Sequence, residues 1–299
     1  MANTKEIKDR INSVQDTKKI TNAMYLIAST KMRRARAELE GSRPYFNALQ
    51  GEIKRVFRTA GHVDNKYFFP REGVQRLDGA SACLVITADK GLAGAYNQNV
   101  IKEAERLRAE CAPMKLFVVG EYGRRYFQQK GIPVAHSFLY TAQNPTLHRA
   151  REIGTLLLGL YNRGEIDKLF VVYTDMKNSL VTEARSTRLL PFHHLQFASP
   201  PEDEPEVERP FEFTPSITAV LDNMMESYIH GFIYGALVDS FCSEQNARMT
   251  AMDAANRNAQ DLLDDLSLRY NRVRQAAITQ EITEVSSGVK ALRQSKAQR

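Results

Sequence analysis

Cysteine and long uncharged stretches are scarce in this sequence, and each scarcity excludes a class of protein. The 299 residues contain three cysteines, Cys83, Cys111 and Cys242, which are too far apart in sequence for a disulfide framework or a cysteine metal cluster. No stretch of about 20 residues lacks charge, so we expect no membrane-spanning helix. The first residues carry acids and no apolar core, which is untypical of a signal or transit peptide. We therefore expect a protein of a reducing, cytoplasmic compartment.

Proline is absent from the first 43 residues, where glycine occurs only at Gly41. Steps of three and four residues run from Ile7 to Val56, and twelve of the fifteen positions are apolar. This heptad spacing is typical of a coiled coil. It predicts a helix over residues 7–56, about 75 Å long, with a kink or local break at Pro44.

Proline is also absent after Pro215. From Ile217 to Ala277 the same spacing gives fourteen apolar residues at eighteen positions. Five more apolar residues continue the stripe, namely Ile278, Ile282, Val285, Val289 and Leu292. A second helix, over residues 216–292 and about 115 Å long, is predicted.

The two predicted helices leave the same central region and should pair in antiparallel fashion. If Val56 faces Ile217, then Ile7 lies near residue 266, and residues 267–292 project beyond their partner. An apolar stripe on this projection would be costly to expose to water. We therefore expect a rod whose tip inserts into another protein.

The central part of the chain has the pattern of an α/β domain. Short apolar runs predict strands at 82–87, 115–120 and 168–174, and a further β-like segment spans 180–192. Helical stretches near 93–111, 121–130 and 146–163 separate them, which is typical of a mainly parallel sheet. We divide the chain into an N-terminal coiled-coil helix, a connector with a Rossmann-like base domain, an exposed acidic and proline-rich loop, and a C-terminal helix with a basic tail, over 1–58, 59–197, 198–214 and 215–299.

The net charge of +6 is concentrated at the N-terminus. Residues 1–36 hold nine basic and three acidic residues, so the rest of the chain is neutral. A solvated helix face is one interpretation, and an acidic partner is the other. The cluster KMRRAR at 31–36 could bind nucleic acid, but the heptads run through it and no aromatic residues interleave. An acidic protein loop is the better partner.

No catalytic motif is present. The loop TADKGLAGAYN, residues 87–97, lacks both the G-x-G-x-x-G of dinucleotide sites and the P-loop pattern. There is no G-x-S-x-G or H-E-x-x-H motif, and His193 and His194 would face opposite sides of a strand. We expect no catalytic, cofactor-binding or metal-binding residue. The alternative is a dinucleotide-dependent enzyme built on the α/β domain.

Two terminal blocks resemble the gamma subunit of the F-type rotary ATP synthase, bacterial type. The first is EIKDRINSVQDTKKITNAM followed by ASTKMRRA, within residues 6–35, with SRPY at 42–45. The second is SEQNARMTAMDAANRNAQDL at 243–262 followed by YNRVRQAAITQEITEVSSG at 270–288. The resemblance covers essentially the whole chain, although Val289 stands where the family usually has alanine.

This resemblance implies a non-catalytic and regulatory shaft. In the family, the coiled coil turns inside a hexamer of alpha and beta subunits and couples ion translocation to ATP synthesis or hydrolysis. The base rests on the c-ring and binds the epsilon subunit, with one copy of the shaft per complex. A peripheral position on the cytoplasmic face of the bacterial plasma membrane is implied, with no cofactor and no nucleic acid.

Family resemblance also assigns contact residues. An acidic lever loop of beta is expected to meet Met24, Lys31, Arg33 and Arg34. The catch loops of the hexamer are expected to meet Arg274, Gln275, Gln280 and Glu281. Contacts with the c-ring are expected at Phe211, Phe213 and Pro215.

Overall fold

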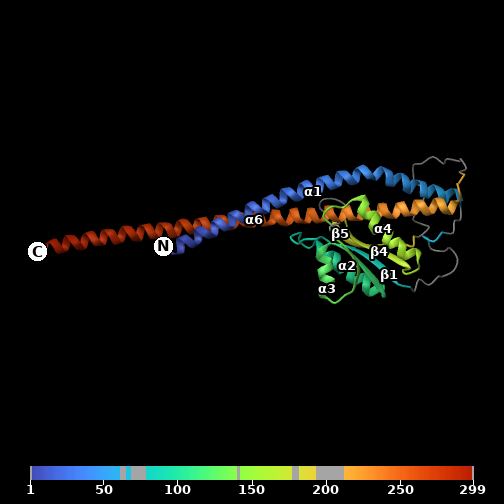
Figure 1. Ribbon diagram of the computed structural model, residues 1–299. Coiled ribbons are helices and arrows are strands. Elements are labelled where there is room, and N and C mark those ends of the chain that lie inside the picture. Colours follow the sequence, from blue (N-terminus) through green and yellow to red (C-terminus); the bar gives the residue numbers. More distant parts are fainter. Residues whose placement is uncertain are drawn as a thin grey trace. The chain divides into compact units, whose positions relative to one another are not determined.

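The computed structural model describes residues 2–60, 65–68, 79–139, 142–176, 182–192 and 212–297 (Figure 1). These residues belong to two compact units. Ala28–Arg248 form a base unit, and Met1–Ile27 with Met249–Arg299 form a distal unit. Most of the predicted acidic loop over 198–214 lies outside the described residues, which resume at residue 212.

A five-stranded sheet is the centre of the base unit. Its order is β3-β2-β1-β4-β5, in which the first four strands are parallel and β5 is antiparallel to β4. The strands are β1 (Ser81–Ile86), β2 (Met114–Val119), β3 (Val134–Phe138), β4 (Lys168–Met176) and β5 (Thr182–Leu190). The mainly parallel α/β base is therefore confirmed, and β3 is a strand that the sequence analysis missed.

Helices cover both faces of this sheet (Figure 1). One face packs beneath α2 (Tyr96–Glu110) and α3 (Glu121–Gln129), where Val100 and Phe127 are buried against Val85 and Val118. The other face packs against α4 (Leu147–Asn162) and the parts of the two long helices that belong to the base unit. Because both faces are covered, all six residues of β1 are buried, which explains why the five residues after Ser81 are all apolar.

Helix α1 (Ala2–Ala60) is continuous through Pro44. The local break predicted at this proline is therefore wrong. Proline removes one backbone hydrogen bond and crowds the carbonyl four residues earlier. Here Glu40 and Pro44 are both exposed, so water can solvate the freed carbonyl. Buried Ala35 and Ile53 hold the helix to the core on either side.

Helix α6 (Ile217–Ala297) is a single helix of 81 residues, as the proline-free heptads predict. In the base unit its buried face includes Leu221, Met225, Ile229 and Ile233. Phe46 of α1 lies so close to Gly231 that a Cβ there would be 2.0 Å from the Phe46 Cε1 atom. The two helices therefore pack closely at this glycine.

Candidate functional site

The crevice between β1 and β4 is where doubly wound α/β proteins bind nucleotides, because the strand order reverses there. In this chain α6 fills it. The backbone N–H of Thr174, at the end of β4, donates to the Ser240 Oγ atom of α6 over 3.2 Å. Ser240 and Ser243 are each 1% exposed. Side chains of the protein itself thus occupy the position that a nucleotide would need.

The loop after β1 is also closed by internal hydrogen bonds. The Ala88 N–H donates to Asn97 Oδ1 over 2.9 Å, and the Glu121 N–H at the start of α3 donates to Asp89 Oδ1 over 2.9 Å. The Gly123 N–H donates to Thr87 Oγ1 over 3.0 Å. These are N–H groups of the kind that cradle phosphate at a helix N-terminus. Since internal acceptors use them, the dinucleotide-enzyme alternative is not supported.

A neighbouring pocket of about 920 Å³ includes Arg124 and Arg125 in its lining. Both guanidinium groups pair with Glu121, over 2.6 Å and 2.7 Å. These hydrogen bonds lower the pKa of Glu121 to about 2. The Glu121 carboxylate thus offsets part of the positive charge that an anionic ligand would need.

A buried ion pair joins the same loop to α6. Arg248 and Glu244 are 2.6 Å apart, and their side chains are only 12% and 7% exposed. Arg248 also donates to the Gly91 carbonyl over 3.1 Å. Burial raises the pKa of Glu244, although Arg248 opposes this shift.

Next to Gly91, Leu92 has a φ of 61° and is 65% exposed. Few non-glycine residues adopt such a conformation. We call the Glu244–Arg248 pair with its bond to the Gly91 carbonyl the buried clasp, and it was not predicted from the sequence. Its only sequence signal is the four-residue spacing of a glutamate and an arginine within SEQNAR.

The basic cluster on α1 lies on the surface of the base unit. Lys31, Arg33 and Arg34 are exposed, and Arg34 pairs with Glu38 over 3.0 Å. Met24 is half-buried and belongs to the distal unit. The structure therefore places the three cations on one exposed stretch of α1 in the base unit.

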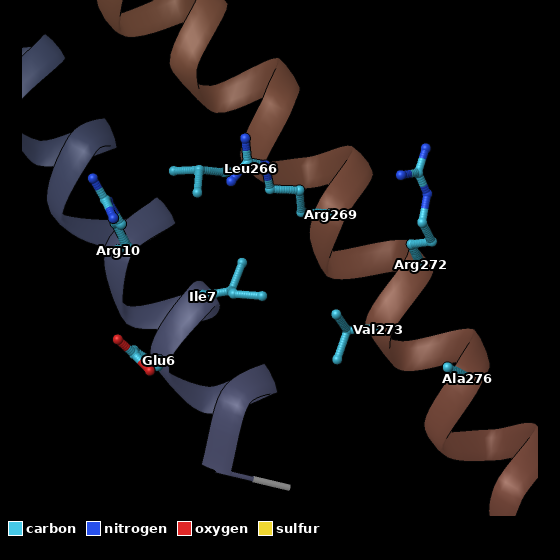
Figure 2. A pocket seen from close by; sticks show the side chains of 8 residues that line it. All are labelled: Glu6, Ile7, Arg10, Leu266, Arg269, Arg272, Val273 and Ala276. Carbon is cyan, nitrogen blue, oxygen red and sulfur yellow. The ribbon is translucent and has the colours of Figure 1, made fainter.

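In the distal unit α1 and α6 lie side by side, as Figure 2 shows. Ile7 and Leu266 line one cleft of about 520 Å³ together with Val273. The predicted meeting of Ile7 with residue 266 is thus confirmed. Further along, Thr21 donates its hydroxyl hydrogen to Asn256 Oδ1, and Lys18 Nζ donates to Gln260 Oε1 over 2.5 Å.

Beyond this pairing, α6 is exposed on all sides from residue 278 to residue 290. The apolar stripe there includes Ile282, which is 64% exposed, and Val285, which is 68% exposed. The predicted contact residues Arg274, Gln275, Gln280 and Glu281 are exposed as well. Gln280 donates to Glu284 over 2.9 Å, so it holds a helical neighbour while remaining accessible.

The three residues expected to contact the c-ring differ in their exposure. Phe213 is half-buried against the core of the base unit, and Pro215 is exposed. Phe211 lies outside the described residues.

Among the residues that the structure describes, no helix is long and apolar enough to cross a membrane. Within the same residues no group of histidine, cysteine and acidic side chains is arranged to hold a metal ion.

Comparison with known proteins gives matches over nearly the whole chain. The family model described as ATP synthase matches residues 3–292. The ATP synthase gamma chain of Ruminiclostridium cellulolyticum is 41% identical over 292 residues, which cover 97% of this chain and 99% of that protein. The ATP synthase gamma chain of Caldanaerobacter subterraneus subsp. tengcongensis is 42% identical over 292 residues, with 95% and 98% covered.

Among solved structures, a chain of the Euglena gracilis mitochondrial ATP synthase, in a structure of OSCP, F1 and c-ring, has a similar fold. Its TM-score is 0.66 at 15% identity, and the match covers 99% of this chain and 96% of that one. At this identity the likeness establishes the fold alone.

Proposed function

This chain belongs to the ATP synthase family as a gamma chain, and we propose that it works as the non-catalytic central rotor shaft of an F-type enzyme. In that role it couples ion translocation through the membrane sector to ATP synthesis or hydrolysis in an alpha–beta hexamer. The observation that carries the proposal is the 41% identity to a gamma chain over 97% of this chain. The crevice filled by α6 supports it, because the base unit then has no nucleotide chemistry to perform.

A shaft of this kind acts by contacting different conformations of its partners unequally. A ligand shifts a conformational equilibrium only by its difference in affinity for the two states. A basic cluster on α1 and an exposed apolar stripe on α6 make such a shaft asymmetric about its axis. As it turns, it favours the closed state of one beta subunit and the open state of another in succession.

We assign the first set of partner contacts to the base-unit end of the paired helices. Lys31, Arg33 and Arg34 are exposed cations, which suit an acidic lever loop of the beta subunits. Opposite charges across such a surface steer the partners together and disfavour wrong registers. Met24 adds a half-buried thioether further along α1.

The second set lies on the unpaired part of α6. Arg274 and Gln275 come just before it, and Gln280 and Glu281 lie within it. All four can reach hydrogen-bonding catch loops of the hexamer. The apolar stripe through Ile282 would be covered by an apolar sleeve, because its exposure to water is costly.

The remaining contacts are assigned to the base and to the membrane side. Phe213 and Pro215, together with Phe211, would lie near the c-ring, and the base unit would bind an epsilon subunit. One copy of the chain would serve each complex. The complex would sit on the cytoplasmic face of a bacterial plasma membrane, with this chain peripheral to the bilayer.

The test is the native mass of the complex that holds the tagged chain after gentle release from its own membranes. We expect one copy of this chain with three copies each of two larger partners. Magnesium-dependent ATP hydrolysis should occur in that complex and be absent from the isolated chain. Recovery of the chain alone, or only with nucleic acid, would contradict the proposal.

A further inference from the structure

The first turns of α1 contribute few apolar side chains to their contact with α6. Residues 4–17, which we call the N-terminal cover, contain three apolar side chains, Ile7, Ile11 and Val14, and all three are only half-buried. Hydrophobic stabilisation is roughly proportional to the apolar area removed from water. The apolar area that the cover itself contributes to this contact is therefore small.

Beneath the cover lies a continuous apolar stripe of α6. Leu263 is 9% exposed and Leu266 is 5% exposed. Val273 is half-buried in the same cleft as Ile7 (Figure 2). After Val273 the stripe continues into the exposed residues that begin at Ile278. The cover thus buries the part of the stripe from Leu263 to Val273, whereas the part from Ile278 onward is already exposed to water.

A polar layer separates the cover from the rest of the helix pair. It consists of Lys18 and Thr21 on α1 with Asn256 and Gln260 on α6, linked by the Thr21–Asn256 and Lys18–Gln260 hydrogen bonds. Lys18 and Thr21 occupy heptad positions at which apolar residues would otherwise join the flanking layers. The Lys18 bond is exposed, so water competes for it.

The cover depends on its packing against α6. In proteins most of the stability of a helix comes from tertiary packing of an apolar face rather than from intrinsic propensity, and the cover is the start of α1, so its other end is the only one that continues as helix. No apolar layer at residues 18 and 21 links the cover to the packed residues that follow Thr21. The cover can therefore separate from α6 while those later residues stay packed. Local opening of this kind occurs in cooperative units rather than residue by residue.

We propose that the N-terminal cover opens from α6 as one unit at the polar layer, which lengthens the exposed apolar stripe of α6 from Ile278 back to Leu263. The opening is a property of this chain by itself. It goes beyond the rotor function and can be tested on the isolated protein, so its failure would leave that function untouched.

Hydrogen exchange of the isolated full-length chain is the first test. Amides of residues 6–17 should share one protection factor, at least about tenfold below that of residues 28–57, with a step at the polar layer. Simple fraying would instead give a smooth gradient from the N-terminus. A gradient, or equal protection on both sides of the layer, would overturn the proposal.

The double variant Thr21→Val with Asn256→Leu tests the role of the polar layer. Replacing both partners by apolar groups of similar shape removes the Thr21–Asn256 half of the layer and leaves the Lys18–Gln260 bond in place, so the step should shrink by about three- to tenfold. Thr17→Val is the matched control, because the exposed Thr17 hydroxyl bonds only its own helix, at the Ser13 carbonyl over 2.9 Å. The control should leave the step unchanged. An unchanged step in the double variant would refute the role given to the layer.

Thiol labelling gives an independent readout that needs no altered layer. Leu266 and Met252 are each 5% exposed on α6, but they lie on opposite sides of the polar layer. In a background without the native cysteines, Leu266→Cys should react with a maleimide at least about tenfold faster than Met252→Cys, because only Leu266 lies beneath the cover. Equal rates would contradict the opening.

Discussion

Glu244 and Arg248 form a deeply buried ion pair. Sequence alone could identify them as an i, i+4 pair, the commonest surface arrangement on a helix. It could not reveal their burial, because that depends on the loop after β1 folding over them through the Gly91 carbonyl. The absence of nucleotide motifs was readable from the same loop, whereas the filling of the crevice by Ser240 required the structure.

Removing Arg248 should be strongly destabilising. Arg248→Ala leaves the Glu244 carboxylate buried without its cation and should lower the free energy of unfolding by about 3–5 kcal/mol. Urea denaturation of the isolated chain measures this. Arg257→Ala is the matched control, since Arg257 pairs with Asp253 at the same 2.6 Å but with 78% and 47% exposure. The control should cost less than about 1 kcal/mol, and similar losses in both variants would count against the buried clasp.

Asp239 predicts a dependence of stability on pH. Burial, assisted by Asp175 and opposed by Arg43, Arg185 and Arg36, raises the pKa of Asp239 to about 6. The folded state therefore binds this proton more tightly than the unfolded state. Its contribution to stability is complete below about pH 4 and is lost as the pH rises through 6.

The variant Asp239→Asn removes this loss. At pH 7.5 we expect the variant to be more stable than the wild type by about 2 kcal/mol, with little difference at pH 4. Denaturation midpoints measured between pH 4 and pH 8 test this. Asp261→Asn, at an exposed position of the same helix, should leave the profile unchanged. A wild-type curve that is flat between pH 4 and pH 7 would disprove the assignment.

At the scale of elements, heptad spacing predicted both long helices and the meeting of Ile7 with Leu266. Periodicity succeeds there because apolar contacts between the helices repeat over many turns. The local break expected from Pro44 is absent, because burial on either side of the proline outweighs one lost hydrogen bond. β3 was missed because its five residues, VAHSF, form a partly exposed edge strand with no continuous apolar run.

The close approach of the long helices predicts opposite effects of alanine at two glycines of α6. Gly231→Ala should destabilise the chain by about 1–3 kcal/mol, because its Cβ would collide with the Phe46 ring. At Gly235 a Cβ meets nothing within 4 Å. Gly235→Ala should therefore stabilise the helix by about 0.5–1 kcal/mol. Thermal unfolding of the two variants measures the contrast, and a stabilised Gly231→Ala would contradict the packing.

At the scale of the whole molecule, a change in the exposed stripe of α6 should affect ATP synthesis by the complex but not the stability of the isolated chain. Ile282→Asp should change the free energy of unfolding of the isolated chain by less than about 0.5 kcal/mol, since the side chain is already 64% exposed. In the assembled complex the new carboxylate would enter an apolar sleeve, which is costly. ATP synthesis in membranes should then fall several-fold. Ser287→Asp, on the opposite side of the same exposed helix, is the control, and equal synthesis in both variants would refute the sleeve.

Rotation of the base unit relative to the hexamer tests the central claim most directly. Cys111 is half-exposed, whereas Cys83 and Cys242 are buried, so a probe can be attached at one native cysteine. With the hexamer immobilised, we expect the probe to turn in one direction when magnesium and ATP are supplied, and to stop when ATP is removed. A probe that stays fixed while the same complex hydrolyses ATP would contradict the rotor function.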